Sequence, residues 1–152
     1  MTYSQDMVHW LAETGIRGDS VPLSDLAAIP TSVSVGGVSL ALEACLWRDF
    51  QPICPPNGQP LIAVARVQPL GSVALPADLS AERIAIMYEQ MAWVARPVKE
   101  HPADVDVPFE VVARNGPEWG PDVSVDVVLQ LSDAEGSIHL LRASNQLIVR
   151  TD

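Results

Sequence analysis

The sequence predicts an all-β domain, an antiparallel immunoglobulin-like sandwich of six to eight strands with a short N-terminal helix. Three observations support this class. Apolar and polar side chains alternate over residues 38–50, thirteen prolines and nine glycines are scattered along 152 residues, and residues 123–131 and 137–149 read as a C-terminal hairpin. The length is sufficient for one core without disulfides. We therefore expect a single β-sandwich domain over residues 31–152.

Residues 1–30 are predicted to form a helical leader. Ser4 to Thr14 has the pattern of a short helix, and residues 24–29 allow one further helical turn. We expect the leader to pack on the body through Trp10 and Leu11. The alternative is a mobile arm that docks elsewhere.

The central strand is predicted over residues 38–50, because side chains of an extended chain point alternately to its two faces. One face carries Val38, Leu40, Leu42, Ala44 and Leu46. Residues 51–60 contain four prolines and Asn57-Gly58, so they are predicted to form a stiff loop rather than a strand. Residues 61–67 form an apolar run, which is typical of a strand buried on both faces.

Residues 80–98 fit two structures. A helical stripe runs through Ile84, Met87 and Met91, but such a helix would be apolar nearly all round. Two short strands that meet near Glu89-Gln90 explain the same residues without requiring burial on every side. The pattern favours the strands.

The last third of the chain is predicted to alternate loops and strands. A polar loop over 97–108 precedes a strand over 109–114 and a second stiff loop over 116–121. The C-terminal hairpin then follows, with a bulge or bend at Asn145 in its second strand.

Charge excludes several partners. The formal net charge is -10, and the chain has no cluster of basic residues, so neither nucleic acid nor an anionic membrane is an expected partner. The sequence contains no run of 18 apolar residues and no basic, apolar signal peptide at its start. The expected location is the cytoplasm, with both cysteines reduced.

The residues that could carry chemistry favour a non-catalytic domain without a cofactor. Cys45 is predicted to be a small core residue and Cys54 a packed loop residue, because their spacing matches no metal or redox motif. The three histidines are far apart, and no nucleophile elbow is present. Asp104 and Asp106 are weak candidates for calcium, because their spacing matches no EF-hand loop.

The two stiff loops are the predicted contact surfaces, because rigid loops lose little conformational entropy on binding. We expect the domain to bind a protein partner or a second copy of itself through them. The alternative is a small-ligand or carbohydrate module, with calcium assistance, in which exposed tryptophans stack on a sugar. The candidate binding residues are Trp119, Trp47, Glu118, Pro55 and Asn57.

Overall fold

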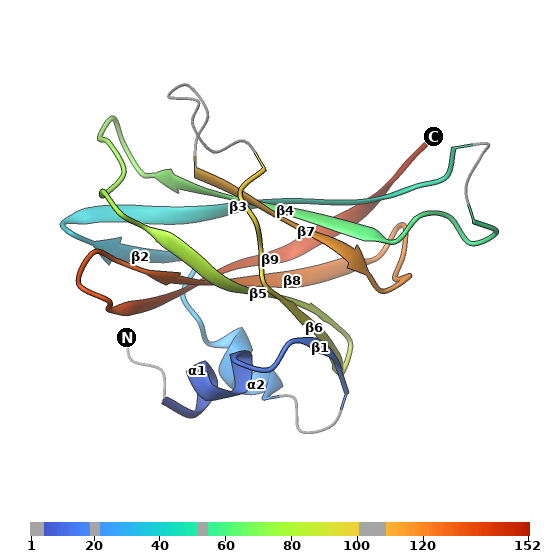
Figure 1. Cartoon of the computed structure of the whole chain (residues 1–152), viewed down its shortest axis with the longest axis horizontal. Coiled ribbons are helices and arrows are strands. Elements are labelled where there is room, and N and C mark those ends of the chain that lie inside the picture. The colour runs from blue at the N-terminus through green and yellow to red at the C-terminus, as the bar shows by residue number, and fades with distance from the viewer. Residues whose placement is uncertain (1–4, 19–21, 52–54, 101–108) are drawn as a thin grey trace.

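The computed structural model describes residues 5–18, 22–51, 55–100 and 109–152. It is mostly β-structure with two short helices, which confirms the all-β class (Figure 1). The helices are α1 (Gln5–Leu11) and α2 (Leu23–Ala27). The strands are β1 (Gly15–Arg17), β2 (Ser32–Val35), β3 (Val38–Asp49), β4 (Leu61–Pro69), β5 (Ser80–Tyr88), β6 (Met91–Ala95), β7 (Phe109–Gly116), β8 (Ser124–Ser132) and β9 (Ile138–Thr151).

The described strands join into one curled sheet in the order β1-β6-β5-β8-β9-β3-β4-β7, with β2 paired to β3. The 14-residue strand β9 holds the sheet together. Its first part pairs antiparallel with β8, and residues 148–151 pair parallel with residues 46–49 of β3. The sheet is therefore mixed, and the purely antiparallel arrangement predicted from the sequence is wrong at this pair. The immunoglobulin-like topology is not confirmed.

The strand β9 bends at Asn145, as predicted, and the bend allows it to pair with β8 on one side and with β3 on the other. Asn145 has a φ of 54°, and its amide donates a hydrogen bond of 3.0 Å to Asp126 Oδ1. The pairing of β8 with β9 shifts register at the same place, between Val125 and Val127. An extra residue of this kind strengthens the local twist, so the strand turns from one half toward the other.

Residues 80–95 are two strands, as the sequence pattern favours. The strands β5 and β6 pair from Ile84 with Ala95 to Tyr88 with Met91, which leaves Glu89 and Gln90 as the turn. The outward side chains of these two strands are buried beneath the helices; they are Ala85, Met87, Ala92 and Val94. The apolar residues on both faces of these strands are explained by burial on both sides.

Two apolar clusters organise the molecule. The larger one lies inside the curl, between β3, β4 and β7 on one side and β5, β6 and β8 on the other, and it contains Trp93. The smaller one lies on the outer face of β5, β6, β8 and β9, where α1 and α2 cover the sheet (Figure 1). The helices contribute Met7, Leu11 and Leu26 to it, and Ile29 follows α2. In the described residues, no helix is long and apolar enough to cross a membrane.

Candidate functional site

A buried arginine joins the two predicted contact loops. Arg48 continues the inward-facing positions of β3 and is only 3% exposed. Its Nε donates to the carbonyl of Gln59 at 3.1 Å, its Nη1 to that of Gly120 at 2.9 Å, and its Nη2 to that of Asn57. A buried guanidinium must place its donors on acceptors. Arg48 therefore fixes the loop after β3 against the loop that precedes β8.

The aromatic ring of Phe50 completes this end of the molecule. The Cζ atoms of Arg48 and Arg150 lie 5.0 Å and 4.3 Å from the ring centroid. Gly58, with a φ of 82°, packs against the same ring, where a Cβ atom would lie 2.3 Å from it. The loop over residues 51–60, which we call the proline loop, is thus tied to β3 in its described part, by its backbone and by the ring.

The predicted binding residues are distributed over this end and the adjoining sheet face. Pro55, Asn57 and Glu118 are exposed on the two loops. Trp119 is half-buried, packs on the inner core and contacts Tyr88 in a tilted arrangement, with ring centroids 5.5 Å apart. Asp104 and Asp106 lie outside the described residues.

Trp47 belongs to a different surface, the outer face of β3, β4, β7 and the end of β9. It lies between Val149 of β9 and Ile62 of β4 in a cross-strand row. The next row is Cys45 and Val64, with Val112 of β7 beside Val64. Val64 and Val112 are themselves buried, so the accessible part of this surface, which we call the Trp47 face, consists of Trp47, Ile62, Val149 and Cys45. Leu147, two residues before Val149 on β9, is a further exposed apolar residue.

A third row beside the Trp47 face is charged. Arg66 of β4 lies between Glu43 and Glu110, with N···O distances of 3.3 Å and 2.5 Å. The hydrogen bond to Glu110 and the negative charge of that carboxylate raise the pKa of Arg66. On β7, Arg114 makes two bonds of 2.6 Å and 2.7 Å to Glu100. The charges of this face are thus paired, although the whole chain is strongly acidic.

Cys45 corrects one sequence-based prediction. It is exposed on the Trp47 face and is not a core residue. The reason is its position: it is out of phase with Leu40 and Leu46, which point into the core. The helices cover the outer face of the other half of the sheet, so the outward residues of β3 remain accessible. Cys54 lies outside the described residues.

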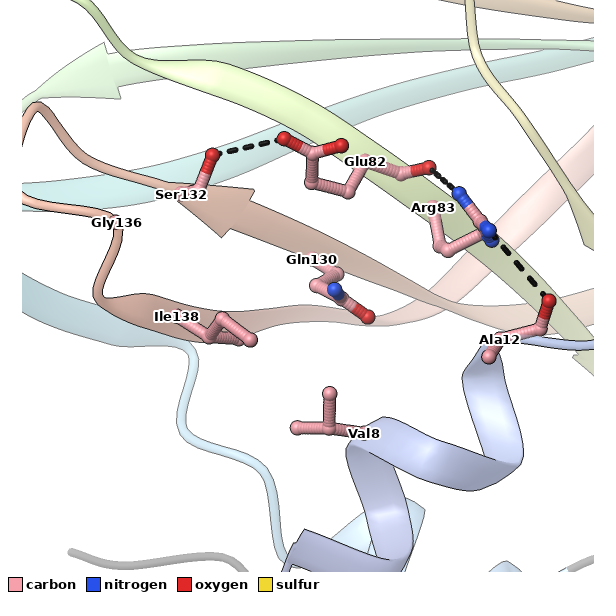
Figure 2. Close-up of a pocket in the computed structure, with 8 residues that line it drawn as sticks. All are labelled: Val8, Ala12, Glu82, Arg83, Gln130, Ser132, Gly136 and Ile138. Atoms are coloured by element: carbon pink, nitrogen blue, oxygen red, sulfur yellow. Dashed lines mark hydrogen bonds between the residues drawn. The ribbon is translucent and has the colours of Figure 1, made fainter.

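A second location of interest is a cavity of about 300 Å³ between α1 and the sheet (Figure 2). Glu82 and Arg83 of β5 line it together with Gln130 and Ser132 of β8. The remaining lining residues are Val8, Ala12, Gly136 and Ile138. The pairing of β5 with β8 shifts register between Ala81 and Arg83. Glu82 is the extra residue, so a bulge brings two neighbouring charged side chains to one cavity.

Polar atoms of this cavity are only partly paired. The Ser132 hydroxyl donates to Glu82 Oε1 at 2.8 Å, and Arg83 donates to the carbonyls of Glu82 and Ala12 at 2.7 Å and 3.5 Å (Figure 2). Arg83 Nε and Gln130 Oε1 are buried without a partner among the described residues. Gln130 itself is only 8% exposed.

The turn before β9 holds an acid–histidine pair. Asp133 accepts hydrogen bonds from the amides of Glu135 and Ser137, and its Oδ2 lies 2.9 Å from His139 Nε2. The hydrogen bond with His139, followed by those from the two amides, lowers the pKa of Asp133.

Asp133→Asn is expected to destabilise the domain at neutral pH and to matter progressively less in acid. A carboxyl whose pKa is lowered by folding adds stability above its ordinary value, and this stability is lost as pH falls through the folded pKa. Urea unfolding of both proteins at pH 7 and below about pH 4 tests this. A difference in stability that stays constant with pH would contradict the assignment.

In the described residues, no group of three or more His, Cys, Asp or Glu side chains is placed to hold a metal ion. Comparison of the chain with protein-family models, curated proteins and solved structures gave no match. Function is therefore inferred from the surfaces of the molecule itself.

Sequence reasoning missed Arg48, Glu82, Arg83 and Gln130. A signal existed for two of them. Arg48 falls in the inward phase of β3, and Gln130 interrupts the apolar run of β8. The bulge that brings Glu82 and Arg83 to the cavity has no such signal, because it depends on how β5 pairs with β8.

Proposed function

We propose that this β domain is a non-catalytic module that associates with a second copy of itself through the Trp47 face and the adjoining proline loop. We also propose that the two halves of the sheet face each other as the layers of an immunoglobulin-like sandwich do. We further propose that the protein is cytoplasmic and that it binds neither nucleic acid nor a membrane.

One contrast carries the proposal. The helices α1 and α2 cover the outer face of β5, β6 and β8. No described helix covers the outer face of β3, β4 and the end of β9, where Trp47 is half-buried and Val149 is exposed. Val149 is 42% exposed, and Leu147 on the same strand is also exposed. Neighbouring exposed apolar residues on a rigid sheet are typical of an association surface.

Continuity with the loop supports the same surface. Gln59 donates to the carbonyl of Asp49 at 2.8 Å, and Phe50 donates to that of Thr151 at 2.7 Å. The two acceptors, Asp49 and Thr151, lie two residues beyond Trp47 and Val149, so these bonds hold the proline loop next to the Trp47 face. Exposed Pro55 and Asn57 add a loop to this surface whose backbone is already held in place by Arg48.

Charge pairing on this face supports a second copy as the occupant. Two chains of net charge -10 repel each other over most of their surface. On the Trp47 face, however, Arg66 and Arg114 are paired with carboxylates. A two-fold arrangement places the same patch against itself. The mixed row around Arg66 then offers each copy groups of both signs, so a guanidinium of one copy can face a carboxylate of the other.

Val149→Glu is expected to weaken self-association about tenfold or more, because each copy would bury an unpaired carboxylate against apolar side chains. Sedimentation equilibrium over a range of protein concentrations measures the effect. Ile16→Glu is the matched control: Ile16 is 54% exposed on β1, far along the sheet order from β3, and should leave association unchanged. A wild-type protein that stays monomeric up to millimolar concentration would refute the proposal.

A further inference from the structure

The cavity beneath α1 has complementary unpaired atoms on its walls. Arg83 Nε is a buried donor and Gln130 Oε1 a buried acceptor, and neither has a partner among the described residues. A buried polar group without a hydrogen bond loses free energy relative to water, so native structures leave few of them. Both residues line the same cavity (Figure 2), and because the two atoms are themselves buried, a molecule in the cavity reaches them only after small rotations of the two side chains.

The charged and apolar residues that line the cavity indicate which chemical class of ligand it can bind. Glu82 and Arg83 give the cavity one carboxylate and one guanidinium. These balance each other, so a ligand that carries one charge of each sign leaves no excess charge in the site. The opposite wall is apolar and is formed by Val8, Ala12 and Ile138. About 300 Å³ is at the lower end of ligand pockets.

We propose that this cavity binds a small zwitterion with an apolar side chain, the chemical class of the apolar α-amino acids. Once these rotations expose both atoms, the ligand carboxylate accepts from Arg83 Nε and Nη2, which form one side of the guanidinium fork. Nη2 is available because its bond to the Ala12 carbonyl is long, at 3.5 Å. The ligand ammonium donates to Gln130 Oε1 and to the carboxylate of Glu82. The apolar side chain lies against Val8 and Ile138.

The bulge at Glu82 gives the site its geometry. A regular strand would send the side chains of Glu82 and Arg83 to opposite faces of β5. The register shift at this point allows both to line the cavity. The Ser132 hydroxyl donates to Glu82 Oε1, which holds that carboxylate in position and leaves Oε2 for the ligand.

Calorimetry and thermal unfolding of the full chain with L-leucine test the site. L-Leucine should bind and raise the melting temperature, because a ligand of the native state stabilises it. Isoamylamine, which lacks the carboxylate, and 4-methylpentanoate, which lacks the amine, should each bind about tenfold more weakly or worse. Failure of L-leucine to bind at millimolar concentration would overturn the proposal and leave the cavity to solvent. Equal binding of isoamylamine would also overturn it.

Gln130→Met distinguishes a ligand site from a merely structural residue. The substitution keeps the length of the side chain and removes the unpaired oxygen, so the ligand-free protein should unfold at the same or a higher temperature. Affinity for L-leucine should nevertheless fall about tenfold. Gln146→Met is the control, because Gln146 bonds Ser144 and does not line the cavity. Arg83→Met should lose binding in the same way, and unchanged affinity in both cavity variants would refute the site.

Discussion

Arg48→Met is expected to lower the free energy of unfolding by about 3–5 kcal/mol, because it removes a buried guanidinium that makes three hydrogen bonds. The substitution keeps much of the apolar stem but removes all donors. The carbonyls of Asn57, Gln59 and Gly120 then lose their bonds to the guanidinium. Both loops depend on these bonds, so the loss extends to the whole end of the molecule.

Urea unfolding measures this prediction, and Arg150→Met is its control. Arg150 is the direct neighbour of Arg48 in the parallel pair of β3 and β9, and its guanidinium also lies over Phe50. Its side chain is 52% exposed, however, and its hydrogen bond is to Asp152 at the surface. Arg150→Met should change stability by less than about 1 kcal/mol. Equal effects of the two substitutions would contradict the role of Arg48.

Gly116→Ala is expected to be the second severe substitution, with a loss of about 3 kcal/mol. A Cβ atom at this position would lie 2.5 Å from the Trp93 ring. Trp93 is buried in the inner core and packed on several sides, so the ring has little freedom to move away. Gly116 ends β7, and its backbone must approach the ring closely for β4 and β7 to close over the core.

The control for this prediction is Gly18→Ala. Gly18 also lacks a left-handed φ, but the nearest atom to its added Cβ would be 4.0 Å away on Met91. Thermal unfolding should show little change for that variant. Combining Gly116→Ala with Trp93→Phe should recover part of the loss, because the clashing atoms belong to the larger indole ring. If the stability losses of the two single substitutions simply add in the double variant, the added Cβ atom and the indole ring do not clash, which would contradict the prediction.

The strands were predictable where one physical pattern dominates. In residues 38–50 and 123–131 one face is apolar at almost every second position, so period-two reasoning places these strands well. The missed strands have other causes. β1 has three residues, too few to show alternation, and β2 is marked only by the turn at Gly36 and Gly37, both with positive φ. A Gly-Gly pair after alternating residues is a hairpin signal.

The mixed character of the sheet was not predictable, because it depends on tertiary pairing. β9 has 14 residues, and β8 pairs only with residues 138–147 of it. The last residues of β9, 148–151, pair in parallel with the end of β3. Nothing local in the sequence distinguishes this partner from another. The same holds for Cys45, whose apolar character favours burial but whose exposure follows from which half of the sheet the helices cover.

The central claim, that the Trp47 face is covered by a second copy, is tested most directly at Cys45. Cys45 is exposed on this face, so its thiol reports whether the face is accessible. In a Cys54→Ser protein, the rate of alkylation by iodoacetamide should fall as protein concentration rises, and Val149→Glu should abolish the fall. An alkylation rate that is independent of concentration and equal in the two proteins would contradict the claim.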